Sequence, residues 1–128
     1  MSGVVLARYQ FENTRKLVAA LRSGSYKEGD YNLLRMPHSD SYSVLGVACD
    51  VVDPTGWRLV SSMYVSVHWT HLESRRPTAQ VIDYFGFSCD RGWRLPLGAG
   101  TMRLHIWAQK ERLNFLQVAD LIEHKVLY

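Results

Sequence analysis

Residues 113–124, LNFLQVADLIEH, carry the clearest secondary-structure signal in the chain. Asn114 is a residue type that often caps a helix, and Gln117 follows three positions later, as in a capping box. Leu113 and Val118 occupy the two positions that form a hydrophobic staple. The segment therefore predicts a helix from Asn114 to about His124, whose buried residues are Val118, Ala119, Leu121 and Ile122.

Two shorter helices are predicted upstream from the same kinds of signal. One runs over about residues 14–21, with Asn13 as its cap and Gly24 placed for a left-handed C-terminal turn. The other runs over residues 78–85 and ends at Gly86.

Residues 42–52 fit two structures. Their β-branched residues suggest a buried strand, whereas Val44, Ala48 and Val51 fall at i, i+4 and i+7, which suggests a helix. We favour the helix, which would end at the turn-forming sequence DPTG, residues 53–56.

The remaining segments predict strands and loops. Strands are expected over residues 31–36, 57–60 and 64–70, and residues 87–100 are expected to form an irregular loop because of their glycines and proline. Alternation over residues 101–109 favours a strand, with a helix as the alternative. Together these elements predict a single α+β domain over residues 1–128, with about four helices packed on a small, mainly antiparallel sheet.

The composition limits the class of protein. The chain has 128 residues, of which 47% are hydrophobic and 12% aromatic, so it can bury a core and is not an intrinsically disordered chain. It has no apolar run of about 18 residues and no signal-peptide pattern at its start, so we expect a cytoplasmic protein that does not bind a membrane. Its two cysteines, Cys49 and Cys89, are expected to be free thiols.

The net charge of +3 hides one local excess of positive charge. Residues 91–112 hold five basic residues and one acid, together with two tryptophans. Arginine and tryptophan are enriched where proteins meet their partners. We therefore predict a surface that binds a partner or an anion, formed by Arg91, Trp93, Arg94, Arg103, Lys110 and Arg112.

Other chemistry has weaker support. His68 and His71 stand three apart near the end of a predicted strand with no third ligand close by, so no metal site and no cofactor are predicted. Cys49 lies in an apolar segment, and no catalytic motif surrounds the more accessible Cys89. Residues 101–125 would form a helix-turn-helix if residues 101–109 were helical.

A set of short blocks resembles a family of small uncharacterised bacteriophage and bacterial proteins. The blocks are AALRSGSYKEG at residues 19–29, YSVLGVACD at 42–50, the Gly56-Trp57 pair, YFGF at 84–87 and LNFLQVADLIE at 113–123. Two places depart from the family pattern: Ser43-Val44 replaces a pair of cysteines, and residues 107–109 replace Leu-Asn-Asp. The resemblance implies phage or prophage ancestry and slightly favours a helix over residues 101–109.

Three functions follow as expectations. The first is a non-enzymatic phage accessory protein that binds a host protein in the host cytoplasm and counteracts a defence system. The second is a protein that binds a nucleotide or nucleic acid through the basic and aromatic residues of the segment 91–112. The third is a small hydrolase that uses Cys89 or a histidine.

Overall fold

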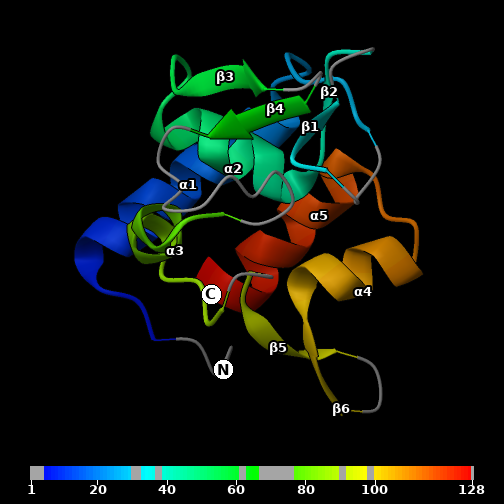
Figure 1. Cartoon of the computed structure of the whole chain (residues 1–128). Helices are drawn as coiled ribbons and strands as arrows, with labels where there is room; N and C mark the ends of the chain where they lie inside the picture. The colour runs from blue at the N-terminus through cyan, green and yellow to red at the C-terminus, as the bar shows by residue number, and fades with distance from the viewer. Residues whose placement is uncertain are drawn as a thin grey trace.

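The computed structural model describes residues 5–29, 33–36, 39–60, 63–66, 77–89, 92–97 and 100–127. These residues form an α+β domain, as the sequence predicts (Figure 1). Its helices are α1 (Arg8–Arg22), α2 (Val44–Val52), α3 (Ala79–Phe85), α4 (Leu104–Lys110) and α5 (Phe115–Ile122), which continues into the π-helical turn η1 (Glu123–Leu127).

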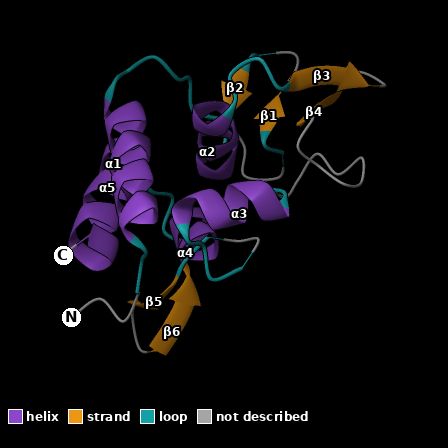
Figure 2. Ribbon diagram, turned by 90° about the vertical axis from the view of Figure 1, so that its left-hand side faces the viewer, coloured by secondary structure: helices purple, strands orange, loops and turns teal. Residues whose placement is uncertain are grey.

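The described strands form three antiparallel pairs instead of the one small sheet expected from the sequence. They are β1 (Arg35–Met36) with β2 (Ser41–Tyr42), β3 (Trp57–Val60) with β4 (Met63–Ser66), and β5 (Arg94–Leu97) with β6 (Gly100–Arg103). The first two pairs lie at one end of the molecule and β5–β6 at the other (Figures 1 and 2). Within the described part of the chain, no helix is both long and apolar enough to cross a membrane.

Helix α1 lies at the centre of the helical packing. It contacts α2, α3, α5 and η1, and it runs side by side with α5 (Figure 2). Leu17, Val18 and Leu21 are buried in these contacts. Thr14 is also fully buried, and its hydroxyl donates to the carbonyl oxygen of Gln10 at 2.7 Å. The helix therefore buries more than one face.

The predicted start of α1 is wrong by six residues. The helix begins at Arg8, because the side chain of Gln10 accepts a hydrogen bond from the Ala7 N–H at 2.9 Å. Asn13, expected as the cap, instead donates to the carbonyl oxygen of Tyr84 at 2.9 Å. The predicted left-handed turn is confirmed, since Gly24 has φ +76°.

Residues 44–52 form a helix, which confirms the preferred prediction. The Ser43 side chain accepts from the Gly46 N–H and caps the first turn. Gly46 lies so close to Leu34, the residue before β1, that an added Cβ would clash with the Leu34 carbonyl oxygen. At the other end, Asp50 accepts hydrogen bonds from the Tyr26 hydroxyl at 2.5 Å and from Trp57 Nε1 at 2.8 Å. Asp50 thus joins α2 to two segments that are distant in sequence.

The segment from residue 87 to 109 departs from the sequence prediction. Residues 94–97, expected to lie in a loop, form β5, and the strand predicted over 101–109 ends at Arg103. Helix α4 then begins, because Leu104 and Ala108 stand one helical turn apart and are both buried. The alternation that suggested a strand therefore holds only for the first part of the segment.

Helix α3 with its Gly86 cap, the strand over 57–60 and the final helix confirm their predictions. Asn114 Oδ1 accepts from the Gln117 N–H at 2.8 Å, and Gln117 Oε1 accepts from the Asn114 N–H at 2.9 Å, which completes the capping box. Leu121 is half-buried where full burial was expected. The predicted strands over 31–36 and 64–70 are shorter in the described residues, and residues 31–32 and 67–70 lie outside them.

The α5 cap and core provide the first test of stability. We expect Asn114→Ala to lower the free energy of unfolding by about 1 kcal/mol through loss of the cap. Ile122→Ala removes a fully buried side chain and should cost roughly 2–5 kcal/mol. Urea denaturation followed by circular dichroism measures both values. Equally small losses would show that α5 contributes little to the core.

The close approach of α2 to Leu34, the residue before β1, provides the second test. Gly46→Ala should lower the free energy of unfolding by about 1–3 kcal/mol or more, because the backbone must shift to admit the methyl group. Gly100→Ala is the matched control, since its Cβ would meet no atom within 4 Å. A stable Gly46→Ala protein would mean that the two segments can separate without cost.

Candidate functional site

The β5–β6 hairpin carries the exposed arginines of the predicted surface. Antiparallel register pairs Arg94 with Arg103 and Leu95 with Met102. Leu95 and Leu97 are buried, whereas Arg94, Thr101 and Arg103 are exposed. Because successive side chains of a strand point to opposite faces, the hairpin has an apolar inner face and a basic outer face.

Arg94 and Arg103 lie directly opposite each other. The Leu104 N–H donates to the carbonyl oxygen of Trp93 at 2.8 Å, so the next pair along, Arg94 and Arg103, is not joined by ladder hydrogen bonds. In such pairs the Cα atoms are about 4.5 Å apart and the side chains are closest, and like charges there are destabilising. Within the described residues neither arginine has an acidic partner. Within the described part of the chain, the hairpin thus presents two adjacent cations that no acidic side chain neutralises.

A hollow of about 200 Å³ lies beside this arginine pair. Its wall includes Ile106, because α4 begins directly after Arg103 and brings its first turn against the hairpin. The lining residues are Arg94, Thr101, Met102, Arg103 and Ile106. The hollow therefore combines a cationic rim with apolar side chains and can receive an anionic group that carries an apolar neighbour.

The prediction that Trp93 belongs to the binding surface is wrong. Its side chain is 1% exposed and packs edge-on against Phe87, with 4.8 Å between the ring centroids. Trp93 stands two residues before Leu95 and four before Leu97, so it shares their inward direction. The sequence placed tryptophan and arginine next to each other, and the pleat of the strand points them to opposite faces.

Lys110 and Arg112 do not join the arginine pair. Lys110 is the last residue of α4 and stands seven residues after Arg103, about 10 Å along the helix, and Arg112 lies beyond it. Lys110 Nζ lies 5.9 Å from the ring centroid of Trp107, and Arg112 occupies the turn before α5 with φ 54°. Arg91 lies outside the described residues. Of the five predicted residues that the structure describes, it therefore brings together two, Arg94 and Arg103.

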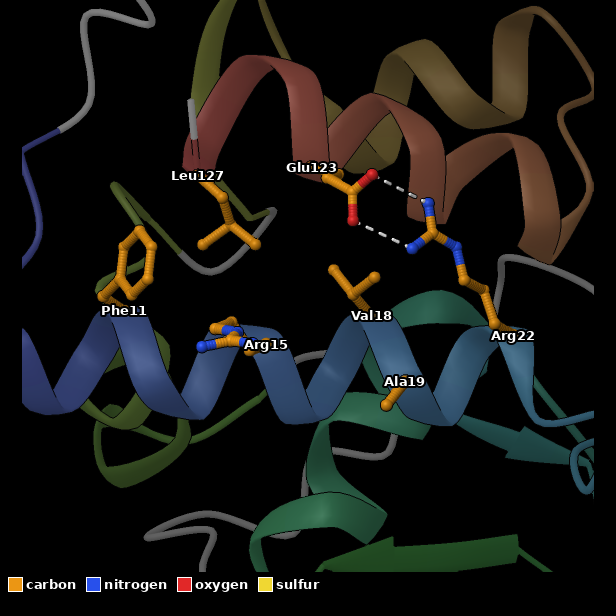
Figure 3. A pocket seen from close by; sticks show the side chains of 7 residues that line it. All are labelled: Phe11, Arg15, Val18, Ala19, Arg22, Glu123 and Leu127. Carbon is orange, nitrogen blue, oxygen red and sulfur yellow. Dashed lines mark hydrogen bonds and ion pairs between the residues drawn. The ribbon is translucent and has the colours of Figure 1, made fainter.

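A second hollow, of about 490 Å³, lies between α1 and the α5–η1 segment (Figure 3). Its lining residues are Phe11, Arg15, Val18, Ala19, Arg22, Glu123 and Leu127. The residues from α1 recur at intervals of three or four, which marks a single helical face. The sequence did not indicate this hollow, because its local pattern predicts a helix that starts after Phe11.

One end of this second hollow is closed by ion pairs. Arg22 donates to Glu123 at 2.9 Å and to Asp120 at 2.7 Å, and Figure 3 shows the paired contacts with Glu123. The hydrogen bonds with Arg22 lower the pKa of Glu123, and both carboxylates raise the pKa of Arg22. The Arg22 side chain therefore pairs with two carboxylates and joins α1 to the α5–η1 segment. Arg15 is more exposed and lies 3.9 Å from Glu12.

The helix-turn-helix expected for a helical segment 101–125 has a geometric counterpart in α4 and α5. Phe115, Val118 and Ile122 of α5 are buried. The exposed side of α5 offers Leu116, Gln117 and Asp120. A recognition helix normally presents basic and polar side chains to the bases, and this exposed set contains an acid and no cation. Helix α5 therefore does not resemble a DNA-reading helix.

The two cysteines occupy different environments. Cys49 is 1% exposed, and burial raises the pKa of its thiol, so it is a core residue and a poor nucleophile. Cys89 is half-buried, and its sulfur lies 3.7 Å from the carbonyl oxygen of Gly92. His68 and His71 lie outside the described residues.

No protein-family model, curated protein or solved structure matches this chain.

Thiol reactivity tests the environment of the cysteines. In the native protein we expect Cys89 to react with a thiol reagent and Cys49 to stay protected, because a buried thiol with a raised pKa supplies little thiolate. Without added reductant, denaturation in guanidinium should reveal two thiols. A Cys89→Ser protein should show no reaction with the thiol reagent until it unfolds. Rapid labelling of Cys49 in that native variant, or no thiol after denaturation, would contradict the assignment.

Proposed function

We propose that this chain is a non-enzymatic accessory protein of bacteriophage type that binds an acidic surface of a host protein. The binding surface, called here the arginine surface, consists of Arg94, Thr101, Met102, Arg103 and Ile106. The observation that supports it is the cross-strand pair of Arg94 and Arg103 without acidic partners in the described residues.

The arginine pair favours an anionic partner on energetic grounds. Two cations directly opposite each other destabilise the free hairpin, and a carboxylate placed between them removes that repulsion. The guanidinium group also matches a carboxylate geometrically, because it donates two parallel hydrogen bonds. Binding therefore relieves a cost that the free protein carries.

A protein partner fits this surface better than a nucleic acid does. Single-stranded nucleic acids are bound by a basic groove together with aromatic rings on which bases stack. Trp93, the tryptophan next to Arg94, is buried, and Lys110 lies over the ring of Trp107. The arginine surface has apolar side chains from Met102 and Ile106 instead, which suit the acidic and apolar mixture of a protein surface.

The proposal predicts the effect of neutralising the pair. In an Arg94→Gln, Arg103→Gln protein, affinity for a fluorescent peptide of eight glutamates should fall roughly tenfold or more, since each charge-assisted hydrogen bond contributes about 1.5–3 kcal/mol. Fluorescence anisotropy at low ionic strength measures the affinity. The melting temperature should stay equal or rise, because the repulsion is removed.

An Arg8→Gln, Lys16→Gln protein is the matched control, because it loses the same charge from exposed positions on α1. Its affinity for the peptide should stay close to that of the unmodified protein. Equal affinities for both double variants would overturn the proposal. Tighter binding of a twelve-nucleotide oligothymidylate through Arg94 and Arg103 would replace it with the nucleic-acid function.

A further inference from the structure

The two edges of the β5–β6 hairpin are not equivalent. In the described residues the hairpin has two strands, so each strand has one side that faces away from its partner. Because Arg94–Arg103 and Pro96–Thr101 are the pairs without ladder hydrogen bonds, the backbone groups of these four residues point outward. An outward backbone group is a potential hydrogen-bonding partner for another strand.

The outer edge of β5 is occupied. The outward N–H of Arg94 donates to the Ser88 hydroxyl at 3.1 Å. Pro96, the next outward position, has no N–H to donate. Proline at an edge and side-chain cover are two ways in which proteins prevent unwanted strand pairing. The β5 edge is therefore closed to a further strand.

The outer edge of β6 has no such cover among the described residues. Gly100, Thr101 and Arg103 are exposed. The N–H and C=O of Thr101 and the N–H of Arg103 point away from β5, whereas the C=O of Arg103 lies at the cap position that begins α4. Three backbone groups are thus available in a row beside the arginine pair.

We propose that an extended segment of the partner protein binds as a third strand along the outer edge of β6. This inference rests on the proposed function and specifies its binding mode. The backbone of the segment pairs with Thr101 and Arg103, and its side chains on the outer face stand beside the two arginines. A neighbouring strand lies about 4.8 Å away, which brings an acidic side chain within reach of Arg103.

The pleat also sets the sequence pattern of the partner. Side chains of an added strand alternate between the two faces of the sheet. Those on the face of Arg94 and Arg103 are acidic, and those between them lie on the face of Met102 and are apolar. The segment that fits is therefore extended and alternates acidic with apolar residues, unlike an acidic helix.

The test uses a fluorescent seven-residue peptide of alternating glutamate and valine as its probe. Thr101→Pro removes an outward N–H and leaves the hairpin ladder intact, so it should weaken binding at least tenfold. Thr101→Ala loses the same side-chain hydroxyl but keeps the backbone donor, so it should bind at least tenfold more tightly than Thr101→Pro. Circular dichroism and the melting temperature report whether each variant is folded.

Two further peptides test the same contact without changing the protein. One carries N-methyl groups on its odd-numbered amides and the other on its even-numbered amides. Because an added strand pairs through only one of these sets, one peptide should lose binding and the other should keep it. Equal binding of the two peptides, together with equal binding by Thr101→Pro and Thr101→Ala, would overturn the strand addition.

The outcomes separate this inference from the proposed function. Loss of binding in Arg94→Gln, Arg103→Gln alone, with no difference between the two Thr101 variants or the two methylated peptides, overturns strand addition and leaves the acidic partner in place. Unchanged binding in the arginine variant, with loss in Thr101→Pro, overturns the charge-based function and supports pairing at the β6 edge.

Discussion

The packing of α1 against three other helices holds the fold together. Its apolar residues pack against α5 and α2, and Arg22 fixes its end to α5 through Asp120 and Glu123. Its first turns are bound to α3 by polar contacts, in which Asn13 donates to Tyr84. Because α5 follows α4 and α4 follows β6, the place of α1 also determines where the hairpin stands.

Elements whose ends are set by neighbouring residues were predictable from the sequence. The capping box at the start of α5 joins Asn114 to Gln117, three positions apart. Helix α3 is likewise capped by its own flanking residues, Thr78 and Gly86. The start of α1 is also set by a contact three residues apart, from the Ala7 N–H to Gln10, but alanine is a poor capping residue and the sequence favoured Asn13. Asn13 is a good cap by type, but its amide is used by α3, which lies far along the chain. A tertiary contact thus decided between two local possibilities.

The candidate site was half predictable for a related reason. The sequence indicated a basic and aromatic segment, and Arg94 and Arg103 do lie together. Treating residues 87–100 as a loop removed the alternation that separates Trp93 from Arg94. Pro96 favoured that loop, although a proline is compatible with an edge strand whose N–H position faces outward. Recognising that Pro96 lies at an edge requires the register between β5 and β6, and no local sequence pattern gives that register.

The hairpin can carry two opposed arginines because the side chains on its other face are buried in the core. Trp93, Leu95 and Leu97 are all buried on the inner side, and burial of such side chains contributes about 1.5–3 kcal/mol each. Like charges across a strand pair cost a fraction of that. The core therefore offsets the repulsion, and the outer face is free to keep an arrangement that is unfavourable alone and favourable with an anion. Replacing these arginines should therefore both stabilise the free protein and weaken binding, because both effects come from the same pair of opposed charges.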